Sequence, residues 1–383
     1  MADFLRSLVA VSEKSANLAR AIRSEQTLFE LLVEEKTGEA KNKRFIQDFK
    51  TLADVLIQEM VRHEIGTKFP SMRDHIYGEE DNTFTNTLGE TITVGVKATK
   101  EETSTLLSIA LDGNTAAADI LASVIHEDIQ HVEDEKVQSC NLDIEVSSLA
   151  VWIDPIDSTA EYIKGVSDAV DVNGIYAEGL QCVTVLIGVY DMTTGLPVIG
   201  VINQPFQFYD STTLKWRGRY VWGVAYNGVQ RNSYPDTHAK HNKRLNLLTV
   251  LSPSEKQPVK SAVVSLPNGT IQYGSGAGYK ALCVTDKFAD LYILNRNTTF
   301  KWDCCAPHAV IRSMGGGMLD LKKAMKLSAN DPLSNSDILY HKPDVLEWTP
   351  GQKWSNSGGV LVYWSEDTAR KAISALVRHL KSS

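Results

Sequence analysis

Apolar residues near the start of the chain recur at steps of three and four, the spacing that is typical of amphipathic helices. The first such segment is marked by Leu5, Leu8, Val9, Leu18, Ala19, Ile22, Leu31 and Leu32. A second runs from about residue 45 to 61 and carries Asp54 inside its apolar pattern. An acid at that position does not suit an amphipathic helix unless its side chain faces a cleft.

The pattern becomes broken and strand-like after Pro70. Residues 149–153 form a short apolar run that Asp154 and Pro155 stop, which predicts a buried strand that ends at a functional edge. Further strands are predicted at residues 91–94, 183–190, 198–203 and 220–226. A tight turn at residues 191–195 joins two of them, so this part of the sheet is predicted to be antiparallel.

The last third of the chain alternates between the two patterns. It predicts strands at residues 262–265, 291–294, 318–321 and 359–364, and helices at 279–284, 307–314 and 367–380. We therefore expect an N-terminal half, residues 1–245, of helices and an antiparallel sheet, and a layered β/α half, residues 246–383. Residues 95–140 have helical spacing and are interpreted as an insertion, whose role the pattern leaves open.

Composition and charge restrict the possible partners of this 383-residue chain. The 39 Lys and Arg residues against 47 Asp and Glu residues give a net charge of −8, which disfavours binding to nucleic acid or to an anionic membrane. The five cysteines are odd in number and widely scattered, which favours reduced thiols in the cytoplasm. Asp3 and Arg6 interrupt any secretory signal at the start.

The sequence DPIDST at residues 154–159 is the most informative motif. Its two carboxylates follow a predicted buried strand and would repel each other strongly unless a cation neutralised them. Carboxylate oxygens are the ligands that Mg²⁺ prefers. Ser158 and Glu161 also match a capping box, so a helix is predicted to begin there. Taken alone, the motif fits equally well a strand that ends in surface turn residues.

Three weaker motifs accompany it. Glu79 and Glu80 follow a glycine, Asp303 precedes a predicted short helix with Pro307 in its first turn, and residues 274–280 (GSGAGYK) lead into another helix. The first two have structural explanations, namely a solvated loop and an N-cap aspartate. The third could present N–H groups and one lysine to a phosphate, but it lacks the ending of a P-loop and is of low specificity alone. His308 is interpreted as a residue on the helix surface.

Taken in this order, the motifs Gly-Glu-Glu, Asp-Pro-Ile-Asp-x-Thr and Trp-Asp-x-x-Ala resemble those of the lithium-sensitive, Mg²⁺-dependent phosphomonoesterase family, which includes inositol monophosphatases and 3′(2′),5′-bisphosphate nucleotidases. The chain is most similar to the branch that acts on inositol polyphosphates. The 73-residue spacer between Glu80 and Asp154, the GSGAGYK segment and WSNSGG at residues 354–359 favour that branch. The resemblance implies an α/β (mixed α+β) fold, a five-layered α/β/α/β/α sandwich with a largely antiparallel first sheet and a mixed second sheet.

The resemblance also implies two or three Mg²⁺ ions and inhibition by Li⁺. Glu79, Asp154 and the carbonyl of Ile156 would hold one ion, and Asp154, Asp157 and Asp303 a second. Glu80 would lie in the same acidic pocket. Asp54 and Thr159 would activate the attacking water.

Substrate contacts are implied less directly. Ser158, Thr159 and Asp157 would lie against the phosphate that is removed, while Gly276, Ala277, Lys280, Ser254 and Lys256 would face the inositol ring or its second phosphate. The expected reaction removes the 1-phosphate of inositol 1,4-bisphosphate and inositol 1,3,4-trisphosphate. The expected protein is a monomer or weak homo-oligomer whose partner is a small molecule.

Three alternatives stay open. The first is a nucleotidase of the same family. The second is a phosphatase that uses an aspartyl-phosphate, although such enzymes space their two aspartates two apart and here they are three apart. The third is an inositol-phosphate-binding protein without catalytic activity, which would have no need of a water-activating pair.

Overall fold

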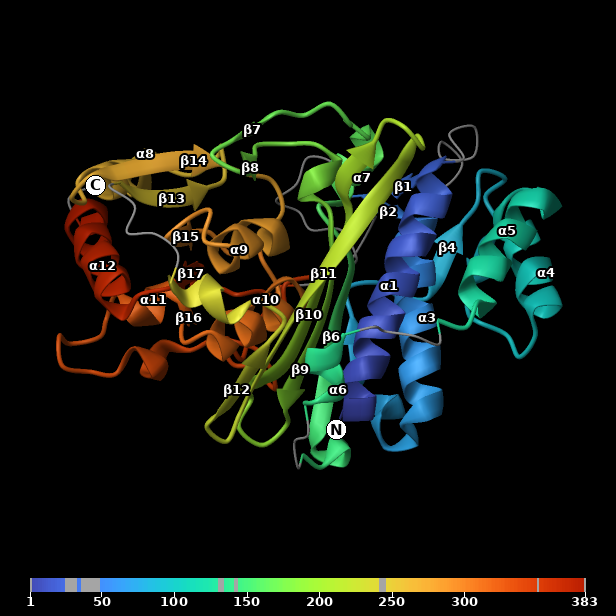
Figure 1. Ribbon diagram of the computed structural model, residues 1–383, viewed down its shortest axis with the longest axis horizontal. Coiled ribbons are helices and arrows are strands. Elements are labelled where there is room, and N and C mark those ends of the chain that lie inside the picture. The colour runs from blue at the N-terminus through green and yellow to red at the C-terminus, as the bar shows by residue number, and fades with distance from the viewer. Residues whose placement is uncertain are drawn as a thin grey trace.

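The structure is a computed structural model that describes residues 2–24, 33–35, 49–129, 134–140, 144–240, 246–349 and 351–381. Two large β-sheets stand side by side, with helices between them and on both outer faces (Figure 1). None of the described helices combines the length and the apolar composition that crossing a bilayer requires.

The first sheet has six strands in the order β12-β11-β10-β9-β6-β3. Its members are β3 (Ile76–Gly78), β6 (Leu149–Asp157), β9 (Thr184–Asp191), β10 (Pro197–Asp210), β11 (Lys215–Tyr226) and β12 (Val229–Asn232). All neighbouring pairs are antiparallel except β3 and β6, which are parallel. The largely antiparallel first sheet is therefore confirmed.

The second sheet has five strands in the order β14-β13-β15-β17-β16. They are β13 (Leu247–Leu251), β14 (Gly269–Tyr273), β15 (Leu291–Leu294), β16 (Gly317–Asp320) and β17 (Val360–Tyr363). Strand β13 pairs in parallel with β14 and β15, whereas β17 is antiparallel to both of its neighbours. This mixed sheet also matches the prediction.

Helices complete five layers, as Figure 1 shows. From one outer face to the other, the helical layers are α1 (Ala2–Ser24) with α3 (Leu52–Lys68), then α9 (Ala277–Thr285) with α10 (Lys301–Ser313), then α8 (Gln257–Val264) with α12 (Glu366–Lys381). Three separate apolar clusters of buried side chains correspond to these interfaces. The predicted α/β/α/β/α sandwich is confirmed.

The remaining elements are short or peripheral. Helices α4 (Lys100–Ala110) and α5 (Thr115–His126) lie beyond α1 and α3, on the side away from the sheet (Figure 1). The others are α6 (Glu135–Gln138), α7 (Thr159–Lys164) and α11 (Leu321–Ala324), the strand pairs β1–β2 (Val33–Glu35, Phe49–Thr51), β4–β5 (Thr83–Thr85, Thr91–Thr93) and β7–β8 (Asp171–Val172, Ile175–Tyr176), and the 3-10 turns η2 (Pro70–His75), η3 (Val146–Ser148), η4 (Leu180–Cys182), η5 (Asp236–Lys240) and η6 (Leu333–Ser336).

A row of three glycines lets α10 lie directly against the first sheet. Gly188, Gly200 and Gly223 are cross-strand partners on β9, β10 and β11. A Cβ atom added to Gly200 would lie 2.1 Å from the carbonyl oxygen of Ala306, and one added to Gly188 would lie 2.4 Å from the Ala306 nitrogen. The helix backbone therefore occupies the space that three side chains would otherwise fill.

Several predicted boundaries are wrong. The second helix begins at Leu52, because residues 49–51 form strand β2, while residues 45–48 lie outside the described ranges, as do Leu31 and Leu32. Where a strand was predicted at residues 262–265, residues 262–264 are the last part of helix α8, which has Pro258 in its first turn, and Ser265 is the residue that follows the helix. A short apolar run does not distinguish a buried strand from a buried helix face.

Helix α10 also differs from the prediction. It begins at Lys301, six residues early, so Asp303 lies inside its first turn and Pro307 lies in its interior. His308 is fully buried rather than on the surface, and its Nδ1 atom is 3.0 Å from the hydroxyl of Tyr340. Because α10 lies between two sheets, most of its residues are buried. Its sequence therefore lacks the separate apolar and polar faces that mark an amphipathic helix.

We expect Gly200→Ala to destabilise the protein by about 1–3 kcal/mol, because the added methyl group would overlap the backbone of α10. Urea unfolding followed by circular dichroism measures the loss. Gly95→Ala is the control, since a Cβ atom there would meet nothing within 4 Å. Equal stability of the two variants would contradict the close helix-to-sheet contact.

Candidate metal centre

A bulge in β6 brings two carboxylates to the same face of the sheet. Residues three apart in a regular strand point to opposite faces. Here Asp154 pairs with Leu186 and Asp157 pairs with Thr184, so β6 has one residue more than β9 over this stretch. Pro155 lies inside the bulge, where its missing N–H group costs no regular ladder hydrogen bond.

A third carboxylate reaches the same place from α10. Asp154, Asp157 and Asp303 each offer an oxygen atom, and these three atoms all lie within 4.8 Å of one another. The backbone N–H of Phe300 donates to Asp303 Oδ2 over 2.6 Å and fixes that side chain in the first turn of the helix. The structure thus brings together three of the six predicted metal-binding residues in one group.

Asp157 is held by the beginning of helix α9. The backbone N–H groups of Ala277 and Gly278 donate to its carboxylate over 3.2 and 2.8 Å, and the hydroxyl of Thr184 donates over 3.1 Å. Gly276 has φ of +74°, and a Cβ atom there would lie 2.8 Å from Asp157 Oδ2. The glycine-rich segment therefore serves the acidic cluster directly, by supplying positive N–H groups to one of its members.

The cluster is electrostatically unfavourable without a cation. Burial raises the pKa of Asp154 well above its ordinary value, and Glu79, Asp157, Asp303 and Asp54 raise it further. Burial and the neighbouring acids likewise raise the pKa of Asp303. Within the described residues, Asp154 Oδ1 is buried and makes no hydrogen bond. Clustered hard oxygen atoms, one of them without a donor, fit a divalent cation such as Mg²⁺.

The glutamates of the Gly-Glu-Glu motif lie beside this group. Glu79 is close enough to raise the pKa of Asp154 and Asp303, although it is outside the group of three. Its backbone N–H donates to the carbonyl of Ile153 over 3.2 Å. Glu80 is buried, and both of its backbone polar groups contact the side chain of Gln58.

Asp54 has a structural role that the sequence pattern did not predict. It is the third residue of α3, and its Oδ2 atom accepts from the N–H and the hydroxyl of Thr51 over 2.7 and 2.6 Å. Together with the Thr51 hydroxyl, which accepts from the Asp54 N–H, this is a capping box. The acid therefore suits its helix because it lies at the end, and it still lies close enough to influence Asp154.

The capping box predicted at Ser158 and Glu161 does not form. Ser158 has the left-handed conformation, φ 74° and ψ 43°, and its hydroxyl does not cap α7. Glu161 instead accepts from the N–H of Gly179 over 2.9 Å. The Thr159 hydroxyl donates to the carbonyl of Ile156 over 3.0 Å. Left-handed backbone at a serine is strained, and such strain concentrates at functional sites.

The predicted substrate residues fall into two environments. Lys280 is only 4% exposed, lies with its Nζ atom 5.3 Å from the centre of the Tyr292 ring, and is a source of positive potential for Asp157. Ser254 and Lys256 are exposed at the entry to α8. The structure thus separates a buried cation beside the acids from two residues on an open loop.

Sequence reasoning missed Gln58 and Thr184. Gln58 lies one helical turn after Asp54, so the i, i+4 spacing was an available signal. Thr184 opens a strand that was predicted, but the contact with Asp157 depends on the bulge in β6 and has no signal in the sequence.

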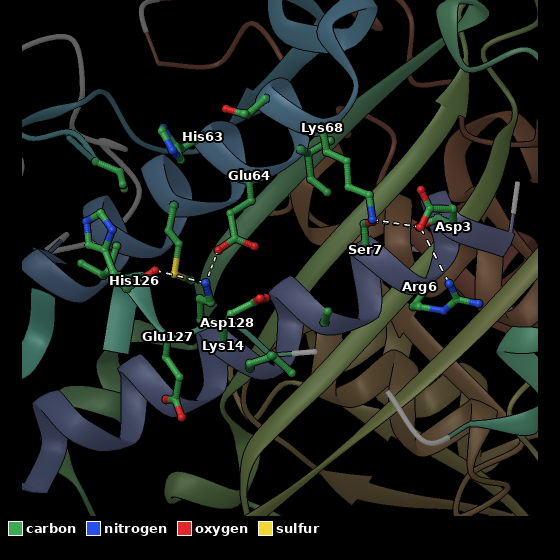
Figure 2. Close-up of a pocket in the computed structure, with 17 residues that line it drawn as sticks. Asp3, Arg6, Ser7, Lys14, His63, Glu64, Lys68, His126, Glu127 and Asp128 are labelled. Carbon is green, nitrogen blue, oxygen red and sulfur yellow. Dashed lines mark hydrogen bonds and ion pairs between the residues drawn. The ribbon is translucent and has the colours of Figure 1, made fainter. Parts of the chain in front are cut away.

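A separate cavity of about 580 Å³ lies between α1, α3 and the end of α5 (Figure 2). The α3 residues that line this cavity lie between Met60 and Lys68, whereas Asp54 lies in the first turn of the same helix. Figure 2 shows Lys14 directed at Glu64, and Lys68 and Arg6 directed at Asp3. Because these charged groups already pair with one another, we assign the chemistry to the acidic cluster.

The sequence pattern of the inositol monophosphatase family matches residues 81–349. The chain belongs to this family. It is 45% identical over 392 residues to the inositol polyphosphate 1-phosphatase of Mus musculus, covering 99% of this chain and 98% of that protein. It is 29% identical over 221 residues to the 3′(2′),5′-bisphosphate nucleotidase 1 of Dictyostelium discoideum, covering 57% of this chain and 60% of the relative.

A solved structure has the same fold. The extragenic suppressor protein suhB of Bartonella henselae aligns with a TM-score of 0.52 at 14% identity, and the alignment covers 97% of each chain. At this identity the likeness concerns the fold alone. The comparison that distinguishes the two branches of the inositol monophosphatase family is the sequence similarity, which covers 99% of this chain for the 1-phosphatase and 57% for the nucleotidase.

We expect Asp154→Asn to stabilise the metal-free protein at neutral pH by at least about 1 kcal/mol, because the folded site disfavours the charged form that this carboxyl has in the unfolded chain. The raised pKa means that the folded state binds this proton more tightly than the unfolded chain. Stability of the parent therefore falls as the pH rises above the unfolded value of about 4. Urea unfolding in a chelator measures the difference.

Below pH 4 or so, the difference between the parent and Asp154→Asn should disappear, since the carboxyl is then protonated in both states. The exposed Asp74 supplies the control, Asp74→Asn, which should leave the stability unchanged. A loss of stability in Asp154→Asn at neutral pH without metal would contradict the repulsion argument.

Proposed function

We propose that the chain is a Mg²⁺-dependent phosphoric monoester hydrolase that removes the 1-phosphate of inositol 1,4-bisphosphate and inositol 1,3,4-trisphosphate. Near full-length similarity to an inositol polyphosphate 1-phosphatase is the observation that carries the substrate class. The group of three carboxylates supports the metal dependence. The five cysteines are free and buried, which supports a reducing compartment, the cytoplasm.

The acids would divide between two ions. Asp154, Asp157 and Asp303 would hold one, and Glu79, Asp154 and the Ile156 carbonyl a second, with Glu80 completing the acidic pocket and leaving room for a third ion. Bound Mg²⁺ would supply charge neutralisation for the phosphate and a lowered pKa for the attacking water. We expect Li⁺ to inhibit turnover by taking the place of one ion.

The chain's own residues would orient the reactants. Thr159 and Asp54 would orient the water, and the Asp54 carboxylate would accept its proton as the water attacks phosphorus. The expected attack is direct and in line, without a phosphoenzyme. The backbone at Ser158 and Thr159, together with Asp157, would lie against the phosphate that is removed. The strained conformation of Ser158 supports this assignment.

The rest of the substrate would meet the segment that begins helix α9. Lys280 would pair with the second phosphate or a ring hydroxyl, and Gly276 would allow the ring a close approach. Ala277 would act through Asp157, to which its N–H donates. Ser254 and Lys256 would contact the substrate from the entry to α8, where both are exposed.

Hydrolysis of a substrate panel tests the proposal. We expect Mg²⁺-dependent release of phosphate from inositol 1,4-bisphosphate and inositol 1,3,4-trisphosphate in preference to adenosine 3′,5′-bisphosphate, with Li⁺ lowering the rate. Faster turnover of the nucleotide would favour the nucleotidase alternative. Binding of inositol phosphates without turnover would favour a non-catalytic protein, and a trapped phosphoryl group on Asp154 would favour the aspartyl-phosphate mechanism.

Asp54→Asn should lower kcat by about 10²–10⁴-fold, the usual contribution of a positioned general base, with a much smaller change in KM. The amide can still accept the hydrogen bonds from Thr51, so the helix cap is preserved. Steady-state kinetics at saturating Mg²⁺ measures the effect. Unchanged turnover would remove Asp54 from the catalytic assignment, whereas the control Asp74→Asn should match the parent.

A further inference from the structure

Gln58 holds the segment that carries Glu79 and Glu80. The Gln58 Oε1 atom accepts from the N–H of Glu80 over 2.9 Å, and its Nε2 atom donates to the carbonyl of Glu80 over 2.5 Å. One side-chain amide therefore satisfies both backbone groups of a single residue. The orientation of the amide is fixed by these partners, because an N–H requires an acceptor and a carbonyl requires a donor.

Burial and a neighbouring glycine both constrain the Gln58 side chain. Gln58 is 0% exposed, so its amide has no access to water as an alternative partner. A Cβ atom on Gly78 would lie 1.9 Å from Gln58 Oε1. The glycine of the Gly-Glu-Glu motif is therefore required by the position of the Gln58 side chain.

The same short segment is tied to a second element. The N–H of Glu79 donates to the carbonyl of Ile153, the residue before Asp154 on β6. On the α3 side, Gln58 follows Asp54 by one turn and lies on the same helix face. Hydrogen bonds from residues 79 and 80 thus link the three segments that carry the acids, namely α3, the loop after β3 and β6.

We propose that Gln58 is a positioning residue that fixes Glu79 and Glu80 relative to Asp54 and Asp154, and thereby sets the affinity of the site for Mg²⁺. The inference rests on the proposed function, since it takes these acids as metal ligands. Both polar atoms of the Gln58 side chain contact the Glu80 backbone, so Gln58 would not itself bind the metal or the substrate. It acts through the backbone of Glu80, as residues behind a metal ligand commonly do.

Gln58→Met tests the proposal, because methionine keeps the length of the side chain while removing both hydrogen bonds. Mg²⁺ is titrated into the metal-free protein and followed by tryptophan fluorescence, since Trp152 and Trp302 lie within two residues of Asp154 and Asp303. We expect the dissociation constant for Mg²⁺ to rise by about 10–100-fold. At saturating Mg²⁺, kcat should fall much less than the affinity does.

Asn203→Leu is the matched control. Asn203 is also a fully buried amide, but it donates to Ser12 and Glu13 of α1. Both variants should have a lower melting temperature without metal, and only Gln58→Met should bind Mg²⁺ more weakly. Parental Mg²⁺ affinity in Gln58→Met would overturn the proposal and leave Gln58 with a structural role alone.

A variant that fails to fold can be distinguished from a failure of the proposed function. If Gln58→Met does not fold, Gln58→Asn replaces it, since this amide is shorter by one methylene and should weaken Mg²⁺ binding to a smaller extent. Parental affinity in Gln58→Asn would then overturn the proposal. If the parent protein itself neither binds Mg²⁺ nor hydrolyses inositol phosphates, the proposed function fails, and the failure is independent of Gln58.

Discussion

The close contact between α10 and the first sheet is the constraint on which the acidic site depends. Asp303 can approach Asp154 and Asp157 only if the helix backbone comes within van der Waals distance of the strands. The glycine row on β9, β10 and β11 permits this approach, since any side chain in the row would move the helix outward. The packing of α10 against the first sheet therefore also determines where the carboxylates of the site lie.

Fixing these acids in one place costs stability, and backbone hydrogen bonds offset part of that cost. Asp157 accepts two N–H groups from the start of α9, and Asp303 accepts one from Phe300. Asp154 is the exception, because its buried Oδ1 atom has no donor within the described residues. The acid with the least support from the protein is the one shared between the two proposed ions, where the positive charge of a metal would be greatest.

The strand and helix patterns predicted an antiparallel first half and a layered β/α second half, and the DPIDST motif marked two of the acids, because these are local features. The five layers and the remaining acids were implied by the family resemblance. The sequence could not predict the bulge at Asp154, which depends on pairing with β9, or the contact of Gln58 with Glu80. Burial between two sheets also hid the start of α10 from its apolar pattern. Each of these features depends on contacts between segments that are distant in the chain. The strand prediction for residues 262–265 was wrong for another reason, because a short apolar run fits a buried strand and a buried helix face equally well.

Two of the acids have the same position in their helices, and this explains why helix starts recur around the site. Asp54 and Asp303 are each the third residue of a helix, and each accepts a hydrogen bond from the backbone N–H just before that helix. The first turn of a helix has N–H groups without internal partners, so an acid there gains donors and a favourable dipole. One oxygen atom of each carboxylate then stabilises the helix. The site is thus assembled from positions where an acid already contributes to the fold, which reduces the cost of gathering like charges.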